Sequence, residues 1–212
     1  NDYLFGGRSS TIFKADEQSL QEIYTTGNDF EVKTAAYLPN NFNCSNDDAT
    51  IDDRSGKKGP EAEAVTIGQI EDKTFAFIGL ERIGGIMVYD ITNPEKTEFV
   101  NYINSRDFST DIGGDDSPEG IHFIAGNDSI TGKPQLVVAY EVSGTVGGYD
   151  LTLQKNSDQS GDDKTDNPSQ EPTVEETNNS SNTNTNNKNH SVNTGDASNI
   201  AITIISLIST IV

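Results

Sequence analysis

The chain has 212 residues, with 34 acidic and 14 basic side chains, and carries a formal charge of −20. A negative field of this size repels nucleic acid and anionic membrane surfaces, so we expect no nucleic-acid partner. The single cysteine, Cys44, excludes a disulfide within the chain, and the acidic residues beside it disfavour the thiolate that a catalytic cysteine needs.

Short apolar runs fill residues 1–152, each bounded by Gly, Asn, Asp or Pro and rich in Val, Ile, Phe and Tyr. Runs of this length and composition are typical of β-strands separated by turns. Only DEQSLQEIY, at residues 16–24, offers a helical alternative. In chain order the predicted strands are YLFGG, STIFKA, AVTIGQI, TFAFIGL, GIMVYDI, EFVNYI, GIHFIAG and QLVVAYEV.

Two of these regions repeat one another. Glu81 matches Glu141, Gly84 matches Gly144, and Tyr89-Asp90 matches Tyr149-Asp150, all at an offset of 60. The match extends upstream, so that residues 63–91 and 119–151 both read as Glu, strand, polar turn, strand ending in Glu, glycine turn, and strand ending in Tyr-Asp. TEFVNYIN adds a fourth strand to the first copy, and YLFGGRSSTIFKAD with LQEIYTT forms a partial copy at the start of the chain.

A four-stranded antiparallel unit that repeats in this way is typical of the blades of a β-propeller. We therefore predict an all-β fold, a partial β-propeller of two four-stranded blades plus a remnant. Because propellers have about 4–8 blades, two blades and a remnant do not close a ring. A β-sandwich built from the same strands is the alternative.

Alternate turns of an antiparallel meander point to opposite ends. The turns at 81–85 and 141–144 should therefore share one end with the long insert at 27–62 and the connection at 105–118. This predicts an end rich in carboxylates, with Glu61 and Asp111 beside the main candidates. The candidate metal ligands are Asp47, Asp48, Asp52, Asp53, Glu63, Glu81, Asp115, Asp116, Glu119 and Glu141.

Clustered carboxylates supply the hard oxygen ligands that Ca²⁺ or Mg²⁺ prefers, so we predict a cation site at this end. The alternative is that they cap loops, form Asx turns and carry solvated charge. Arg82 is a candidate for binding an anionic ligand, or else it forms an ion pair with its neighbour Glu81. With only His122 and His190, the chain offers little for a zinc site or a Ser-His-Asp triad, and no catalytic residue is assigned.

The composition changes after residue 152. Residues 153–199 are rich in Asn, Ser, Thr and Asp and hold no aromatic residue, which predicts a disordered linker. Residues 200–212 are apolar and uncharged, but they are shorter than the roughly 20 residues that span a bilayer. We predict the start of a hydrophobic membrane or sorting segment; a sticky tail or an edge strand is the alternative.

The segments KGPEAEAVTIG, TFAFIGLERIGGIMVYDIT, FVNYINSRDF, SPEGIHFI and GKPQLVVAYEVSGTV resemble the choice-of-anchor I propeller domain. That family includes bacterial cell-surface and secreted proteins, some labelled alkaline-phosphatase-like, and animal mesenchyme-specific cell-surface glycoproteins. The resemblance spans most of residues 1–152 and implies a C-terminal part of a longer protein. Related sequences read Pro-Glu-Gly where this chain has Ala62-Glu63-Ala64, whereas the second copy keeps Pro118-Glu119-Gly120.

The family name implies that different anchors follow the same domain. Here SVNTGDASNIAITIISLISTIV is similar to the start of a Gram-positive sortase signal, in which Thr194-Gly195 would be the cleaved bond; a retained membrane anchor is the alternative. The resemblance thus implies an extracellular protein on a Gram-positive bacterial surface, attached to cell wall or membrane through its C-terminus.

Two functions follow from this resemblance and from the acidic end. The first is an interaction or adhesion role, in which the acidic face binds a cation or an extracellular ligand. The second is a metal-dependent phosphoesterase of the alkaline-phosphatase-like kind, whose active site needs further blades. Under the second interpretation the present chain alone should be inactive.

Overall fold

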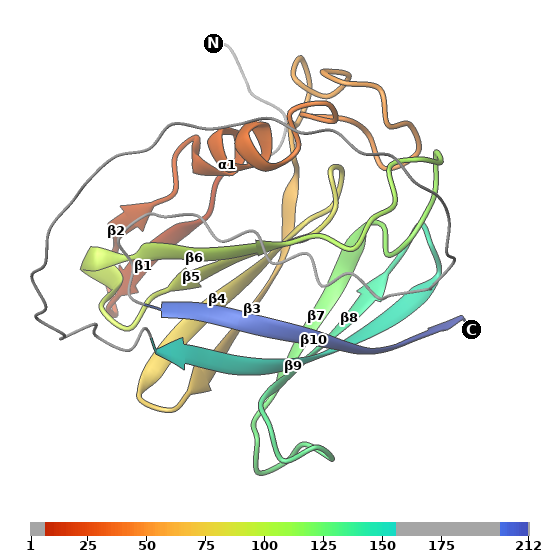
Figure 1. Ribbon diagram of the computed structural model, residues 1–212. Helices are drawn as coiled ribbons and strands as arrows, with labels where there is room; N and C mark the ends of the chain where they lie inside the picture. The colour runs from red at the N-terminus through yellow and green to blue at the C-terminus, as the bar shows by residue number, and fades with distance from the viewer. Residues whose placement is uncertain (1–6, 156–199, 212) are drawn as a thin grey trace, which may run out of the picture.

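The computed structural model describes residues 7–155 and 200–211 and contains two four-stranded antiparallel sheets (Figure 1). The first sheet is a meander of β3 (Ala62–Ile70), β4 (Lys73–Leu80), β5 (Ile86–Asp90) and β6 (Glu98–Ile103). The second sheet is a meander of β7 (Pro118–Ile124), β8 (Gln135–Tyr140), β9 (Thr145–Lys155) and β10 (Ile200–Ile211). The remaining elements are the hairpin β1 (Thr11–Ala15) and β2 (Leu20–Thr25), the helix α1 (Asp29–Tyr37) and the 3-10 turn η1 (Pro94–Lys96).

The predicted all-β class, with two four-stranded units and a remnant, is confirmed. The described part of the remnant holds two strands, β1 and β2, and the described strands do not close a ring. The helical alternative for residues 16–24 is wrong. There the Asp16 carboxylate accepts hydrogen bonds from the backbone N–H groups of Gln18 and Ser19, both at 2.8 Å, and this Asx turn reverses the chain between β1 and β2.

Helix α1 lies within the long insert at 27–62 and was not predicted from the sequence. Its Phe30 is fully buried and meets the Tyr89 ring edge-on, with 6.0 Å between the ring centroids. The Tyr37 and Tyr102 rings also pack together, with their centroids 5.9 Å apart. The Tyr89 hydroxyl also donates to the Asp29 carboxylate in the first turn, at 2.5 Å. The helix therefore covers the face of the first sheet that points away from the second sheet.

Residues 200–211 pair with β9 as the outer strand of the second sheet, which is the edge-strand arrangement. Within the described residues, the structure contains no helix that is both long enough and apolar enough to cross a membrane. Of the predicted linker at 153–199, residues 153–155 continue β9 and residues 156–199 lie outside the described residues. The membrane or sorting role of the apolar segment stays a prediction.

The two sheets stack front to back. Phe77 and Val88 of the first sheet share a buried core with Leu136 and Tyr149 of the second. At the offset of 60, Phe77 and Val88 match Val137 and Gly148, which alternate with the core residues and so face away from the first sheet. The second sheet thus turns toward the first sheet the face that, in the first sheet, packs against helix α1. Further sheets can stack with the same relation, as the blades of a propeller do.

Contacts at matched positions also repeat. Asp90 pairs with Lys73 at 2.7 Å, and its counterpart Asp150 pairs with Lys133 at 3.6 Å. The turns at this end differ in length, since residues 71–72 join β3 to β4 whereas residues 125–134 join β7 to β8. The tip of the longer turn, Ile130, is 99% exposed.

The first prediction concerns the contact between the sheets at Gly68. A Cβ atom there would lie 2.3 Å from the Phe123 ring, so Gly68→Ala should overpack the interface and lower the free energy of unfolding by about 1–3 kcal/mol. Gly148→Ala is the matched control, because a Cβ at that strand glycine meets nothing within 4 Å. Urea unfolding of the two variants measures the difference; equal stabilities would contradict this packing.

Candidate functional site

A β-bulge begins the first strand of each sheet, and a glutamate occupies each bulge. The pairing of β3 with β4 shifts register between Ala62 and Ala64, and that of β7 with β8 shifts between Pro118 and Gly120. The extra residues are Glu63 and Glu119. A bulge leaves its extra residue outside the ladder and redirects its side chain, so both glutamates are set by the same backbone irregularity.

The backbone next to each bulge repeats as well. Glu61 and Ser117 both have positive φ angles, of 56° and 64°. Their carbonyl groups accept the N–H groups of Glu81 and Glu141, each at 2.8 Å. The end of the second strand is thereby tied to the start of the first in both sheets, which brings each strand-end glutamate beside a bulge glutamate.

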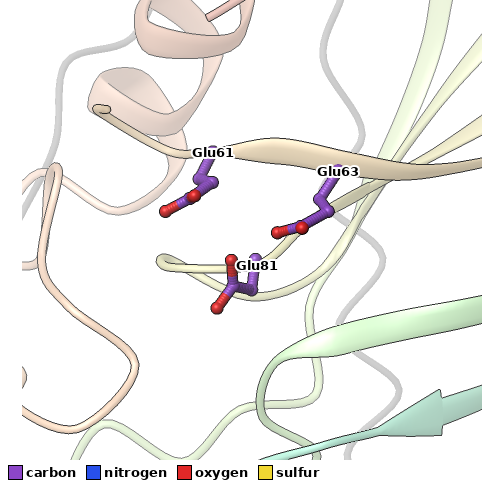
Figure 2. Close-up of side chains that lie close together, drawn as sticks. All are labelled: Glu61, Glu63 and Glu81. Carbon is purple, nitrogen blue, oxygen red and sulfur yellow. The ribbon is translucent and has the colours of Figure 1, made fainter. Parts of the chain in front are cut away.

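We call this end of the two sheets the mouth, formed by the insert (27–62), the turn 81–85, the connection 105–118 and the turn 141–144. At the mouth Glu61, Glu63 and Glu81 offer carboxylate oxygens that all lie within 4.8 Å of one another. Figure 2 shows Glu61 and Glu63 extending from the start of β3 toward Glu81, which follows β4. Glu61 and Glu81 are buried and Glu63 is exposed, so the cluster has one solvent-facing side.

Basic side chains neutralise one side of this cluster. Glu61 pairs with Lys58, with Arg54 at 3.4 Å, and with Arg82 at 2.7 Å. Burial tends to raise the pKa of Glu61, but the hydrogen bonds from Lys58 and Arg82 hold it below its ordinary value. Arg82 also lies 3.1 Å from the Glu81 carboxylate. The candidate ligand-binding arginine is thus engaged in internal ion pairs, the alternative noted from the sequence.

Glu81 and Glu63 have less compensation. Burial, followed by the hydrogen bond with the Glu63 carboxyl, raises the pKa of Glu81 to about 8, although Arg82 acts to lower it. At neutral pH the Glu81 carboxyl therefore retains its proton. Burial and the carboxylates of Glu63 and Glu141 likewise raise the pKa of Glu119. The four repeated glutamates are thus close enough to influence one another.

The four candidate aspartates of the insert, Asp47, Asp48, Asp52 and Asp53, are exposed and bound to local partners. Asp47 accepts from the Ser45 hydroxyl at 2.6 Å, and Asp48 accepts from the Thr50 N–H at 2.8 Å. Asp52 accepts from the Ser55 hydroxyl, and Asp53 pairs with Lys57 at 3.6 Å. These contacts are those of turns and loop ends, and the three-carboxylate cluster includes none of the four.

Asp115 and Asp116 are buried in the connection between the sheets. Asp115 accepts from the hydroxyls of Thr145 at 2.8 Å and Ser105 at 2.9 Å. Asp116 pairs with Arg106 at 3.2 Å; burial raises its pKa to about 6 against the lowering effect of that guanidinium. Both aspartates therefore take part in internal contacts that join the connection 105–118 to itself and to β9.

Asn46 and Arg106 are two buried polar residues of the mouth that were not singled out from the sequence. Asn46 donates to Glu81 at 3.2 Å and accepts from Arg82 at 2.7 Å, so it holds these two side chains in place. Arg106 is the second, and its only sequence signal is a basic residue among acidic ones in the connection.

Cys44, in the insert, is also buried, and burial raises the pKa of its thiol. The proposed cleavage pair Thr194-Gly195 lies outside the described residues.

Comparisons with known proteins agree with the resemblance. A sequence model described as the choice-of-anchor I domain matches residues 1–94. The chain is 30% identical over 163 residues to Gigasin-3a of Magallana gigas, a match covering 68% of this chain and 55% of that protein. It is 23% identical over 106 residues to the mesenchyme-specific cell surface glycoprotein of Strongylocentrotus purpuratus, covering 45% of this chain and 14% of that protein. No solved structure matches.

The resemblance to the choice-of-anchor I family is therefore confirmed over the first part of the chain. The chain spans about half the length of the first relative and a smaller share of the second.

The second prediction follows from the raised pKa of Glu81. Its pKa in the folded protein is about 8, above the ordinary value of 4.5, so the folded state retains a proton that the unfolded chain has released. The free energy of unfolding should therefore fall as the pH rises from about 5 to about 8. Glu81→Gln keeps a neutral side chain at every pH and should make this fall shallower.

Thermal unfolding at several pH values, in a buffer with a chelator, measures this effect. Asp48→Asn is the control, since Asp48 is an exposed carboxylate outside the cluster, and it should follow the wild-type profile. A Glu81→Gln profile that parallels the wild type would show that Glu81 is not the group responsible.

Proposed function

We propose that this chain is part of an extracellular, surface-attached β-propeller whose mouth binds a divalent cation, Ca²⁺ or Mg²⁺, and serves an interaction or adhesion role. The observation that carries the cation site is the convergence of Glu61, Glu63 and Glu81 within 4.8 Å. Glu63 lies in a repeated bulge and Glu81 at a repeated strand end, and Glu61 directly precedes β3, where its carbonyl accepts the Glu81 N–H. The backbone of the sheet therefore positions all three side chains.

The dimensions of the cluster suit one ion. Ca²⁺ binds oxygen ligands at about 2.3–2.6 Å, so two ligands on opposite sides of the ion lie roughly 4.8 Å apart. The Glu81 carboxyl retains a proton at neutral pH that a cation would replace, and the cation would offset the repulsion between the Glu81 and Glu63 carboxylates. The exposed side of Glu63 gives the ion access and leaves room for water or a ligand group.

The location at a cell surface is supported by the relatives and by the sequence. One relative is named a cell surface glycoprotein, and the matching family model is described as a choice-of-anchor I domain. The polar segment at 153–199 has the composition of a spacer, and the apolar segment follows the Thr-Gly pair, as in a sorting signal. The phosphoesterase alternative rests on the resemblance and on the acidic end, and no catalytic residue is assigned to it.

The third prediction tests the cation site by calorimetric titration of the full chain with CaCl₂ and, separately, MgCl₂. We expect saturable heat with at least one of the two ions and a higher melting temperature in its presence. Glu81→Gln and Glu63→Gln should each weaken binding at least about tenfold, the loss seen even for residues that only orient metal ligands. Glu95→Gln, in the η1 turn at the opposite end of the first sheet, should leave binding unchanged. An absence of heat and of stabilisation with both ions would overturn the cation site.

The fourth prediction tests the anchor. If Thr194 is joined to the cell wall after cleavage, Thr194→Ala should abolish covalent wall attachment when the full-length protein is produced in a Gram-positive host. Wall and membrane fractions separated after digestion of the wall measure this, with Thr183→Ala as the linker control. Unchanged attachment of the Thr194→Ala protein would rule out sortase processing and favour a retained membrane segment.

A further inference from the structure

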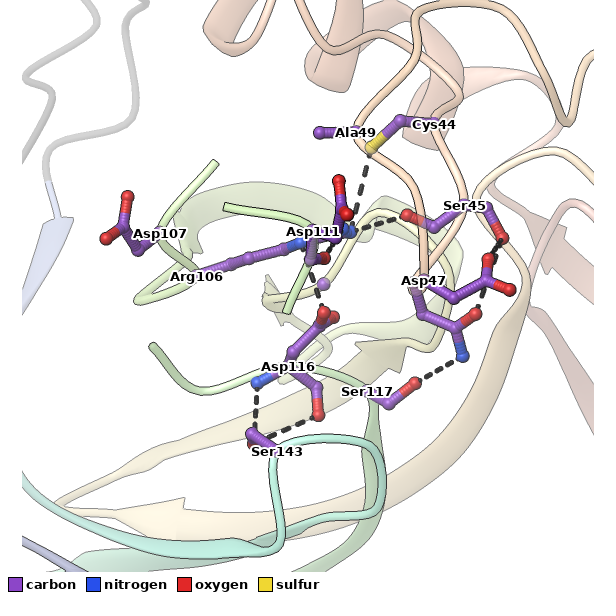
Figure 3. Close-up of polar contacts among 12 residues, drawn as sticks. Cys44, Ser45, Asp47, Ala49, Arg106, Asp107, Asp111, Asp116, Ser117 and Ser143 are labelled. Carbon is purple, nitrogen blue, oxygen red and sulfur yellow. Dashed lines mark hydrogen bonds and ion pairs between the residues drawn. The ribbon is translucent and has the colours of Figure 1, made fainter. Parts of the chain in front are cut away.

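The guanidinium of Arg106 is fully buried at the centre of the mouth. Its Nη1 donates to the Ser45 carbonyl at 2.8 Å, in the insert, and to the Arg82 carbonyl at 2.9 Å, in the turn after β4. Its Nη2 donates to the Asp111 carbonyl at 3.3 Å, within its own connection. Figure 3 shows the Arg106 side chain extended between these segments, with Cys44 and Ser45 on the insert at its far end.

Asp116 continues this network to the second sheet. Its carboxylate lies 3.2 Å from the Nε of Arg106, and both side chains are fully buried. Its backbone N–H donates to the Ser143 hydroxyl at 3.0 Å, and that hydroxyl also lies 3.3 Å from the Asp116 carbonyl (Figure 3). The turn after β8 is therefore joined to the same pair, so the Arg106–Asp116 pair connects all four segments of the mouth.

The chemistry of this position requires arginine. A buried guanidinium has five donors in a rigid planar fork, which can serve carbonyl groups from separate segments at once. A lysine ammonium would retain the charge, but its shorter reach and compact head cannot replace the two ends of the fork. Removing Arg106 would also leave Asp116 as a buried carboxylate without a compensating charge, which is strongly unfavourable.

The carbonyl groups that Arg106 binds flank the residues that hold the cluster. Ser45 precedes Asn46, whose side chain donates to Glu81 and accepts from Arg82. Arg82 follows Glu81 and pairs with both Glu61 and Glu81. A shift of either carbonyl would therefore move the side chains around the carboxylates.

We infer that Arg106 is the positioning residue of the mouth: it holds the insert and the turn after β4 in the register that brings Glu61, Glu63 and Glu81 together. This role goes beyond the carboxylates themselves, because Arg106 is not among the residues that offer ligand atoms. Its effect on binding rests on the proposed cation site, whereas its effect on the conformation of the mouth does not.

The fifth prediction compares Arg106→Met and Arg106→Lys with the wild type in the full chain. Hydrogen exchange followed by mass spectrometry should show faster exchange in peptides covering residues 43–55 and 81–85, with β4 and β5 still protected in Arg106→Lys. Titration with Ca²⁺ or Mg²⁺ should show about 10–100-fold weaker binding, as for other residues that orient metal ligands. Lys73→Met, which removes an ion pair with Asp90 at the far end of the first sheet, is the matched control and should change neither readout.

The outcomes separate the two proposals. If the wild type binds neither ion but the Arg106 variants loosen the mouth, the cation site fails and the positioning role stands. If both Arg106 variants keep wild-type exchange in the mouth, the positioning role is overturned whatever the binding result. Should Arg106→Met not fold, Arg106→Lys and Asp116→Asn, which keep the side-chain volumes closer to those of the wild type, give the same comparison.

Discussion

An even number of antiparallel strands returns the chain to the end where it started, and the arrangement of the mouth depends on this constraint. The first sheet begins at Ala62 and ends at Ile103 at one end, so the connection to the second sheet starts there. The turn after β4 also lies at that end. The number of strands alone therefore brings residues that are far apart in the sequence to the same end, whatever their side chains are.

Side-chain chemistry then gives this end its polarity. Three cationic side chains pair with Glu61, whereas burial and neighbouring carboxyl groups raise the pKa values of Glu81 and Glu119. The compensated side packs against the insert and the less compensated side meets solvent. In a chain with a net charge of −20, this uneven distribution of counter-charges makes these glutamates differ from ordinary surface carboxylates.

The strands and the gathering of the glutamates could be predicted because both are recorded in local pattern and in a repeat. Short apolar runs rich in Phe, Ile, Val and Tyr mark β4 to β6, and the matched glutamates at 81 and 141 mark the shared end. Helix α1 could not be predicted in this way, because its position depends on Phe30 and Asp29 meeting Tyr89, a contact between distant segments. The insert aspartates were expected among the ligands, yet short-range hydrogen bonds, such as that of Asp48 with Thr50, engage them locally. Arg106 has no periodic neighbours, and its role follows only from the carbonyl groups that surround it.

The opposite end of the sheets is under no such restriction. The turn at 125–134 is longer than its counterpart at 71–72, and the bulges and the Lys–Asp pairs of the two units nevertheless correspond. Ile130 at the tip extends wholly into water. Foreign peptides or fluorescent labels can therefore be inserted in the turn at 125–134 without disturbing the carboxylates. Attachment to a solid support through this turn would leave the acidic end facing outward.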